Sequence, residues 1–293
     1  MDSLAVAEQV EKAEWLEPVA DGLQKAVGGA YEATGSGGQA VADFLHGVWL
    51  GHPLHPVLTD IPLGAWATAA VLDIAELSGK DELAPGADAA IAVGLVGALG
   101  SALTGMTDWH KLSEKSTKRV GVAHALINVT ATALFAGSLA ARRKGARGLG
   151  MGLSFAGLTV VSAGAYLGGA LVYDQKIGVD HAPREGLTED WVSVIPLAEL
   201  EEGKPAKAEA AGVPVFLLKR GEQLFALANA CSHLGGPLNE GTLCNGSITC
   251  PWHGSRFALD DGRVLDGPAT YPQPRFDVRI RDGKVQVKAH TGS

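Results

Sequence analysis

The sequence predicts a multi-domain chain, with an all-α four-helix transmembrane bundle followed by an all-β domain. Three stretches, residues 89–107, 120–141 and 149–173, contain no Asp, Glu, Lys or Arg. Each is close to the roughly 20 residues that a helix needs to cross a bilayer. A fourth stretch, residues 56–77, carries acidic residues only near its ends. From residue 191 onward, short apolar runs alternate with Gly, Pro and Asp turns, which is typical of β-strands.

Composition supports this division. The chain has 293 residues and a formal net charge of −8, a length that suggests two domains of roughly 100–200 residues each. Charged residues make up 19%, below the roughly 25% of soluble domains, and the mean hydropathy of +0.13 indicates that part of the chain lies in lipid. The acidic balance argues against nucleic acid as a partner. Three cysteines are too few for a disulfide framework.

The first part of the chain, residues 1–50, predicts acidic and amphipathic helices at 4–27 and 39–50. The five glycines of residues 28–38 predict a linker between them. The second helix groups apolar side chains near one face: Val41, Phe44, Leu45, Val48 and Trp49. Such a helix suits the surface of a membrane, and it equally suits packing against the bundle.

We expect the transmembrane domain at residues 51–173, a polar linker at 174–187 and the β domain at 188–293. Asp282-Gly283 predicts a tight hairpin turn. The apolar runs predict strands at 191–197, 213–218, 224–228, 276–280 and 285–287.

Two short segments of the β domain each contain one cysteine and one histidine. They are Cys231 with His233 and Cys250 with His253, in the pattern C-x-H-x16-C-x2-H. Two Cys and two His can hold zinc, but a zinc finger takes its Cys pair from one segment and its His pair from the other. One of each per segment suits a [2Fe–2S] cluster, in which two thiolates bind one iron and two imidazoles bind the other.

With these residues, the β domain resembles a Rieske [2Fe–2S] domain of the ferredoxin type. Phe257, Asp261-Gly262, Gly267-Pro268-Ala269 and Pro272 strengthen the resemblance. It implies that Cys231 and Cys250 bind the buried iron, and that His233 and His253 bind the solvent-facing iron.

Other positions depart from the high-potential Rieske proteins of cytochrome bc complexes. Those proteins carry a disulfide at the positions of Gly236 and Trp252. In those proteins two side-chain hydroxyls donate hydrogen bonds to sulfur. Ser255 retains the first hydroxyl, whereas Phe257 has no hydroxyl at the second position. Fewer donors to sulfur imply a reduction potential below the high-potential class and above ferredoxin-like centres. We expect Cys244, the third cysteine, to be a small buried apolar residue.

The membrane domain opens with Gly51-His52-Pro53-Leu54-His55-Pro56. Its third span carries His124 and Asn128 four residues apart, on one helix face. With the T-G-x-x-D-W stretch from Thr104 to Trp109, residues 47–173 resemble an uncharacterised family of bacterial four-helix membrane domains. The resemblance implies a topology and no activity.

Ionisable groups inside a membrane bundle are costly and therefore suggest function. One hypothesis is a haem b or quinone site formed by His52, His55 and His124. The alternative is that these histidines cap helix ends and pair with Asp60 or Asp73. Both remain open at this stage.

Together, these features predict a membrane-anchored iron–sulfur protein that passes single electrons between a membrane partner (a quinone or a haem protein) and a soluble acceptor. We expect an electron carrier or oxidoreductase subunit rather than a stand-alone enzyme. Two alternatives are a quinol-oxidising subunit of a cytochrome bc-like complex and a cluster-based redox sensor. The expected location is the bacterial cell membrane, with several spans. The acidic start lacks a basic segment and an apolar core, so we expect the β domain in the cytoplasm.

Overall fold

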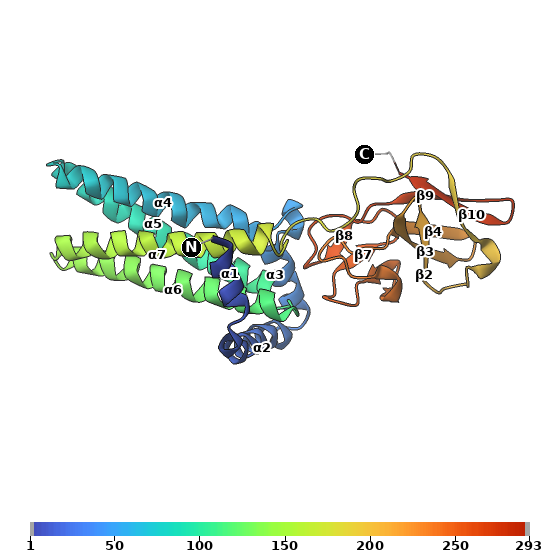
Figure 1. Ribbon diagram of the computed structural model, residues 1–293, viewed down its shortest axis with the longest axis horizontal. Helices are drawn as coiled ribbons and strands as arrows, with labels where there is room; N and C mark the ends of the chain where they lie inside the picture. The colour runs from blue at the N-terminus through green and yellow to red at the C-terminus, as the bar shows by residue number, and fades with distance from the viewer. Residues whose placement is uncertain (1–2, 291–293) are drawn as a thin grey trace. The chain divides into compact units, whose positions relative to one another are not determined.

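The computed structural model describes residues 3–290, which form two compact units (Figure 1). The helical unit comprises residues up to Gly38 together with Leu54–Ile177. The β unit comprises Gln39–Pro53 together with residues from Gly178 onward. A segment that precedes the first long helix in sequence therefore packs with the β domain.

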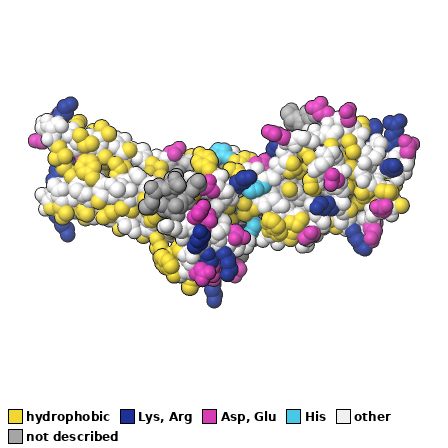
Figure 2. Space-filling view, in the orientation of Figure 1, with side chains coloured by type: hydrophobic (Ala, Val, Ile, Leu, Met, Phe, Trp, Pro, Cys, Tyr) yellow, Lys and Arg dark blue, Asp and Glu magenta, His cyan; other side chains and the backbone are white. Residues whose placement is uncertain are grey.

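Four long helices run alongside one another in the helical unit (Figure 1): α4 (Leu54–Leu77), α5 (Ala84–Trp109), α6 (Lys115–Arg143) and α7 (Arg147–Tyr173). The shortest has 24 residues, which corresponds to about 36 Å at 1.5 Å per residue, more than the roughly 30 Å of a hydrocarbon core. All four are long and apolar enough to cross a membrane. In Figure 2 their flank is mostly yellow and white, with charged side chains gathered at the ends. The predicted four apolar helices are confirmed.

The bundle core takes one well-buried side chain from each long helix: Trp66, Ile91, Phe135 and Val161. The Trp66 and Phe135 rings stack with centroids 4.0 Å apart. A Cβ at Gly94 would lie 2.2 Å from Trp66 Nε1, so the indole requires glycine on the facing helix. Small residues thus allow the close helix packing expected in lipid.

Three shorter helical segments precede the bundle within the helical unit: α1 (Ser3–Glu11), η1 (Glu14–Leu16) and α2 (Glu17–Ala33). They pack on the bundle through the ion pair of Arg119 with Glu17 and through Gln24 Nε2, which donates to Leu112 O at 2.8 Å. The continuous helix predicted at 4–27 is interrupted, because Pro18 in the first turn of α2 begins a new helix.

The linker predicted at 28–38 is wrong. Helix α2 continues to Ala33, and α3 (Ser36–His46) begins two residues beyond Thr34. A glycine inside a helix costs only about 1 kcal/mol relative to alanine, and tertiary contacts override that preference. The short helix η2 (Val48–Leu50) follows α3, and η3 (Asp81–Leu83) leads into α5.

The β unit consists of three antiparallel sheets. The first has the order β1 (Val192–Pro196), β10 (Lys284–Ala289), β9 (Phe276–Arg281). The second has the order β2 (Ala206–Ala210), β3 (Val213–Arg220), β4 (Gln223–Ala228). The third has the order β5 (Thr242–Cys244), β6 (Ser247–Thr249), β7 (Arg256–Ala258), β8 (Val264–Asp266). Two short 3-10 helices complete the unit: η4 (Leu197–Glu199) and η5 (Leu238–Glu240).

Strand β3 connects two apolar cores. Val215 and Leu217 face the core between the first two sheets. Phe216 and Leu218 face the core that also contains Cys231. Because successive side chains of a strand point to opposite faces, one buried strand supports both cores.

The predicted all-β domain is therefore confirmed. The predicted hairpin is present between β9 and β10, where Asp282 (φ 51°) and Gly283 (φ 71°) adopt the positive φ angles of a type I′ turn.

Candidate metal centre

Cys231 and Cys250 begin two loops with the same backbone design. In each loop the cysteine N–H donates to the carbonyl oxygen five residues on, at 2.9 Å from Cys231 and 2.8 Å from Cys250. The N–H four residues on donates back to the cysteine carbonyl, at 2.8 and 3.2 Å respectively. That fourth residue is glycine in both loops, with φ of +76° at Gly235 and +80° at Gly254, a conformation that favours glycine.

Both thiols lie inside the domain, with only 1% of Cys231 and 3% of Cys250 exposed. The two thiols hydrogen-bond to each other. Backbone N–H groups two and three residues beyond each cysteine also donate to its sulfur, those of His233 and Leu234 to Cys231 and those of Trp252 and His253 to Cys250. The two loops therefore direct four backbone donors at two adjacent sulfur atoms.

The backbone donors favour the thiolate form of each cysteine, the form that binds metal. The hydrogen bond from Cys231, together with the backbone donors, lowers the pKa of Cys250 to about 7 despite its burial. The same thiol–thiol hydrogen bond and burial raise the pKa of Cys231.

The two histidines form a second pair, nearer the surface. The rings of His233 and His253 are half-buried, with centroids 5.0 Å apart and planes at 85°. Within residues 3–290, no three His, Cys, Asp or Glu side chains converge where one metal ion could bind. A buried thiol pair and a separate imidazole pair fit a two-iron cluster better than a single zinc ion. The structure thus brings the four predicted ligands together, and their roles as ligands stay a prediction.

Gly236 lets the two loops approach each other closely. A Cβ at this position would lie 2.8 Å from Cys250 Sγ and 3.0 Å from the Trp252 ring. The indole of Trp252 is 57% exposed and meets the His253 ring edge-on, at 6.3 Å between centroids. Cys244 is exposed, so its expected burial is wrong. It ends β5, immediately before the Asn245-Gly246 turn of an edge hairpin, and points outward.

Ser255 and Phe257 lie behind the second loop, and both are fully buried. Ser255 Oγ accepts a hydrogen bond from the Ala269 N–H at 2.9 Å. Phe257 lies on β7, opposite Ile248 of β6. These positions agree with supporting roles for both residues, which also stay predictions.

The sequence reasoning missed Gln273, which braces the first loop. Its Oε1 accepts from the Ser232 N–H at 3.1 Å, and its Nε2 donates to Ala228 O at 2.7 Å and to Ala230 O. Only 2% of this side chain is exposed. The sequence does offer one indication of this role, since Gln273 lies between Pro272 and Pro274. Each proline has a fixed φ angle, which restricts the backbone that carries the amide side chain.

The boundary between the two units divides the three membrane-domain histidines, with His52 on one side and His55 and His124 on the other. His52 belongs to the β unit and is exposed. In the helical unit, His55 Nδ1 lies 2.9 Å from Ser101 O, and His124 Nδ1 lies 2.9 Å from Gly164 O. The alternative of pairing with Asp60 or Asp73 is therefore wrong for these two rings. They bond to carbonyl groups of neighbouring helices instead.

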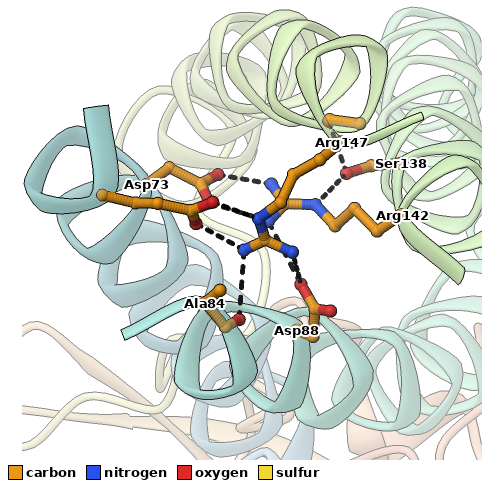
Figure 3. A network of polar contacts seen from close by, with 8 residues as sticks. Asp73, Ala84, Asp88, Ser138, Arg142 and Arg147 are labelled. Carbon is orange, nitrogen blue, oxygen red and sulfur yellow. Dashed lines mark hydrogen bonds and ion pairs between the residues drawn. The ribbon is translucent and has the colours of Figure 1, made fainter. Parts of the chain in front are cut away.

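The other end of the bundle contains a buried ionic network (Figure 3). Arg142 and Asp73 have no exposed side-chain surface and form a two-pronged ion pair, with Arg142 Nη1 2.7 Å from Asp73 Oδ1. Asp88 accepts from Arg142 and from Arg147 at 3.2 and 3.0 Å, and Arg147 also pairs with Glu76. Two arginines face three carboxylates, so each buried charge has an opposite partner, which favours a structural role at this end.

Comparisons with known proteins agree with this division. A family model for the Rieske [2Fe-2S] domain matches residues 190–277, and a model for a predicted membrane protein (DUF2231) matches residues 51–181. Ferredoxin CarAc of Metapseudomonas resinovorans is 31% identical over 98 residues, which are 33% of this chain and 92% of that protein. The anthranilate 1,2-dioxygenase ferredoxin subunit of Burkholderia cepacia is 31% identical over 103 residues, which are 35% of this chain and 95% of that protein.

Longer proteins match over the same region. Human apoptosis-inducing factor 3 is 35% identical over 97 residues, and the chain spans only 16% of its length. Among solved structures, the ferredoxin of carbazole 1,9a-dioxygenase from Nocardioides aromaticivorans IC177 is 27% identical, with a TM-score of 0.33, over 34% of this chain and 98% of that one.

These matches bear out the [2Fe–2S] cofactor and a domain for electron transfer, and they give no support to haem b. Through its β domain the chain belongs to the Rieske [2Fe–2S] family, and that domain follows a predicted membrane domain of the DUF2231 family.

Proposed function

We propose that the chain is a membrane-anchored carrier of single electrons, in which Cys231 and Cys250 hold one iron and His233 and His253 hold the other. A bound [2Fe–2S] cluster takes up and releases one electron. The observation that carries the proposal is the separation of the two ligand pairs, with thiols buried and imidazoles near the surface. The imidazole edge then offers the shortest route to a docked partner, and the backbone donors hold the sulfurs without titrating.

The proposed soluble partner is an oxidoreductase that docks over His233, His253 and the exposed ring of Trp252. The chemical class of this partner comes from the Burkholderia cepacia relative, which is named as the ferredoxin subunit of an anthranilate 1,2-dioxygenase. An exposed aromatic ring next to the imidazole edge suits a protein interface.

The proposed membrane partner is a quinol, bound near His55 and His124. Both Nδ1 atoms face carbonyl oxygens, which only accept hydrogen bonds, so each Nδ1 carries the proton and each Nε2 is an acceptor. Both residues lie toward the same end of the bundle, since His55 is near the start of α4 and His124 is in the first half of α6. Oxidation of one quinol to a quinone releases two electrons, which reduce two one-electron clusters in succession, and two protons. The proposed proton acceptors are the two Nε2 atoms, and at His124 the quinol would displace Asn128 Nδ2, which lies 3.3 Å from Nε2.

The test is reduction of the cluster by a quinol in lipid vesicles containing the purified full chain. We expect a soluble quinol analogue to reduce the wild-type cluster, followed by its visible absorption. His55→Ala and His124→Ala should each slow the reduction at least about tenfold, which is the low end for loss of a proton acceptor. His52→Ala is the matched control and should keep the wild-type rate, because His52 is exposed and belongs to the β unit.

Failure of the quinol to reduce a cluster that dithionite does reduce would contradict the quinol partner and leave the carrier function. A chain that binds no iron and sulfide would contradict the carrier function itself.

We also propose that the β unit faces the cytoplasm. Four spans place residues before α4 and after α7 on one side of the membrane. A C-terminal reporter that is active only in the cytoplasm tests this, and activity of a periplasmic reporter at the same position would contradict it.

A further inference from the structure

Helix α3 is attached to the cluster domain by one of its faces. Asp43 Oδ1 accepts a hydrogen bond from the Gly267 N–H at 2.8 Å. His46 is fully buried, and a Cβ at Gly267 would lie 2.9 Å from its ring. Ala42 is also buried, on the same side. One face of α3 therefore packs on the segment that begins at Gly267.

That segment supports both ligand loops. Ala269 N–H donates to Ser255 Oγ at 2.9 Å, and Tyr271 O accepts from Ser232 Oγ at 2.7 Å. Only one segment thus separates α3 from the loops that begin at Cys231 and Cys250. The position of α3 is therefore tied to that of the metal centre.

The opposite face of α3 is exposed and apolar. Val41, Phe44 and Trp49 are 54%, 58% and 60% exposed. The Phe44 and Trp49 rings stack with centroids 5.6 Å apart, and Trp49 Nε1 donates to Phe44 O at 3.1 Å. Asp43, the one Asp, Glu, Lys or Arg among residues 37–53, is bonded to the β domain. A preorganised, exposed aromatic pair in a segment whose one carboxylate is engaged by the β domain is an unusual surface to leave in water.

Continuity of the chain identifies what covers this face. The first candidate span begins at Leu54, directly after Pro53, the last residue of the segment that packs with the β unit. Residues 48–53 must therefore lie where the chain enters the bilayer. Trp is enriched at this depth because its ring is apolar and its N–H is polar. Interfacial helices normally turn a charged face to water, and in α3 the β domain covers that polar face instead.

From these contacts we infer that the face of α3 and η2 formed by Val41, Phe44 and Trp49 lies in the headgroup layer of the bilayer and holds the cluster domain on the membrane surface. The α3 face then attaches the β unit to the membrane in addition to its chain connections to α4 and α7. This inference does not depend on the identity of the electron donor or acceptor.

The experiment places a nitroxide spin label at Phe44→Cys in the Cys244→Ser background, in the full chain with its cluster. The vesicles contain phosphatidylcholine and phosphatidylglycerol. Lipid-soluble oxygen and a water-soluble nickel chelate then compete to relax the label. We expect access to oxygen to exceed access to nickel several-fold at position 44, and an unchanged visible spectrum of the cluster shows that the fold is intact.

Ile280→Cys is the matched control, because Ile280 is an apolar residue of the same unit and is 50% exposed. Its label should report water. Val129→Cys, in the middle of α6 and 63% exposed, should report lipid. A label at Val41→Cys gives a second reading if Phe44→Cys fails to fold.

Equal nickel access at positions 44 and 280 would overturn the inference, because the face would then be in water. A label at 44 that neither reagent reaches would also overturn it, because protein would cover the face. A label at 129 in water would overturn it together with the assignment of the spans.

Discussion

The charged end of the bundle and the two ligand loops both bury polar groups, but they satisfy them in opposite ways. In the bundle, Arg142 and Asp73 lie fully buried and satisfy each other, side chain to side chain. In the loops, Cys231 and Cys250 receive hydrogen bonds from backbone N–H groups. The first arrangement is complete without any ligand, and the second directs uncharged donors at two metal-binding atoms.

The difference shows where redox chemistry can occur. Backbone N–H groups do not titrate, so they stabilise sulfur in both charge states of a bound group without exchanging protons. An Arg–carboxylate pair is stable only while both charges persist, because removal of one leaves the other uncompensated in a low dielectric. The loops therefore tolerate a change of one charge, and the bundle end resists it.

The largest expected effect comes from Cys250→Ser. A serine hydroxyl remains protonated near neutral pH and cannot replace a thiolate, so we expect complete loss of the cluster. The measurement is iron and acid-labile sulfide per chain, with the visible and EPR spectra. Cys244→Ser is the matched control and should keep the full content, because Cys244 is exposed and lies on an edge hairpin. Loss of the cluster from Cys244→Ser instead would contradict the ligand assignment.

A large effect on the bundle alone is expected for Arg142→Leu. Removing one partner of a buried ion pair should lower the free energy of unfolding by about 3–5 kcal/mol. The measurement is helical circular dichroism during thermal unfolding in detergent, while the cluster absorption should be unchanged. The double variant Arg142→Leu/Asp73→Leu should recover much of the loss, because no buried charge is then left alone. A double variant as unstable as the single one would show that the pair itself provides the stability.

Within the loops, Gly236→Ala should act through steric contact. Its Cβ would lie 2.8 Å from Cys250 Sγ, and overpacking of this kind costs about 1–3 kcal/mol. We expect reduced iron content and shifted EPR g-values. Gly235→Ala is the comparison, because it has no atom within 4 Å of its Cβ but a φ of +76°. It should lower the unfolding temperature of the β unit and leave the g-values unchanged. Identical spectra for the two variants would rule out the steric explanation.

Much of the fold could be predicted from local patterns. Three charge-free stretches and one charge-poor stretch identified the four long helices, and Asp282-Gly283 identified the hairpin, since each pattern has one dominant physical cause. The linker at 28–38 failed because glycine weakens a helix by an amount that packing can offset. The three-residue strands β5–β8 were missed because such short strands show no alternation.

For the site, the spacing identified the four candidate ligands, because C-x-H and C-x2-H each place one cysteine and one histidine in the same loop. Sequence could not reveal the brace by Gln273 or the bond from Gly267 to Asp43, which joins residues 224 positions apart. Such contacts depend on tertiary packing, and no local periodicity encodes them. The separation of His52 from His55 is of the same kind, since a unit boundary passes between two histidines of one motif.

The smallest expected effect would sharpen the comparison within the ligand loops, by adding one side-chain donor to the backbone donors. Phe257 is fully buried in the core that contains both cysteines, so the hydroxyl of Phe257→Tyr has sulfur as its predicted partner. A hydrogen bond of about 1 kcal/mol that favours the reduced state corresponds to a rise of about 40 mV for one electron. A redox titration followed by EPR measures it, with Phe257→Leu as the control that adds no donor. A potential that does not rise in Phe257→Tyr, with iron content retained, would mean that the missing hydroxyl does not set the potential of this centre.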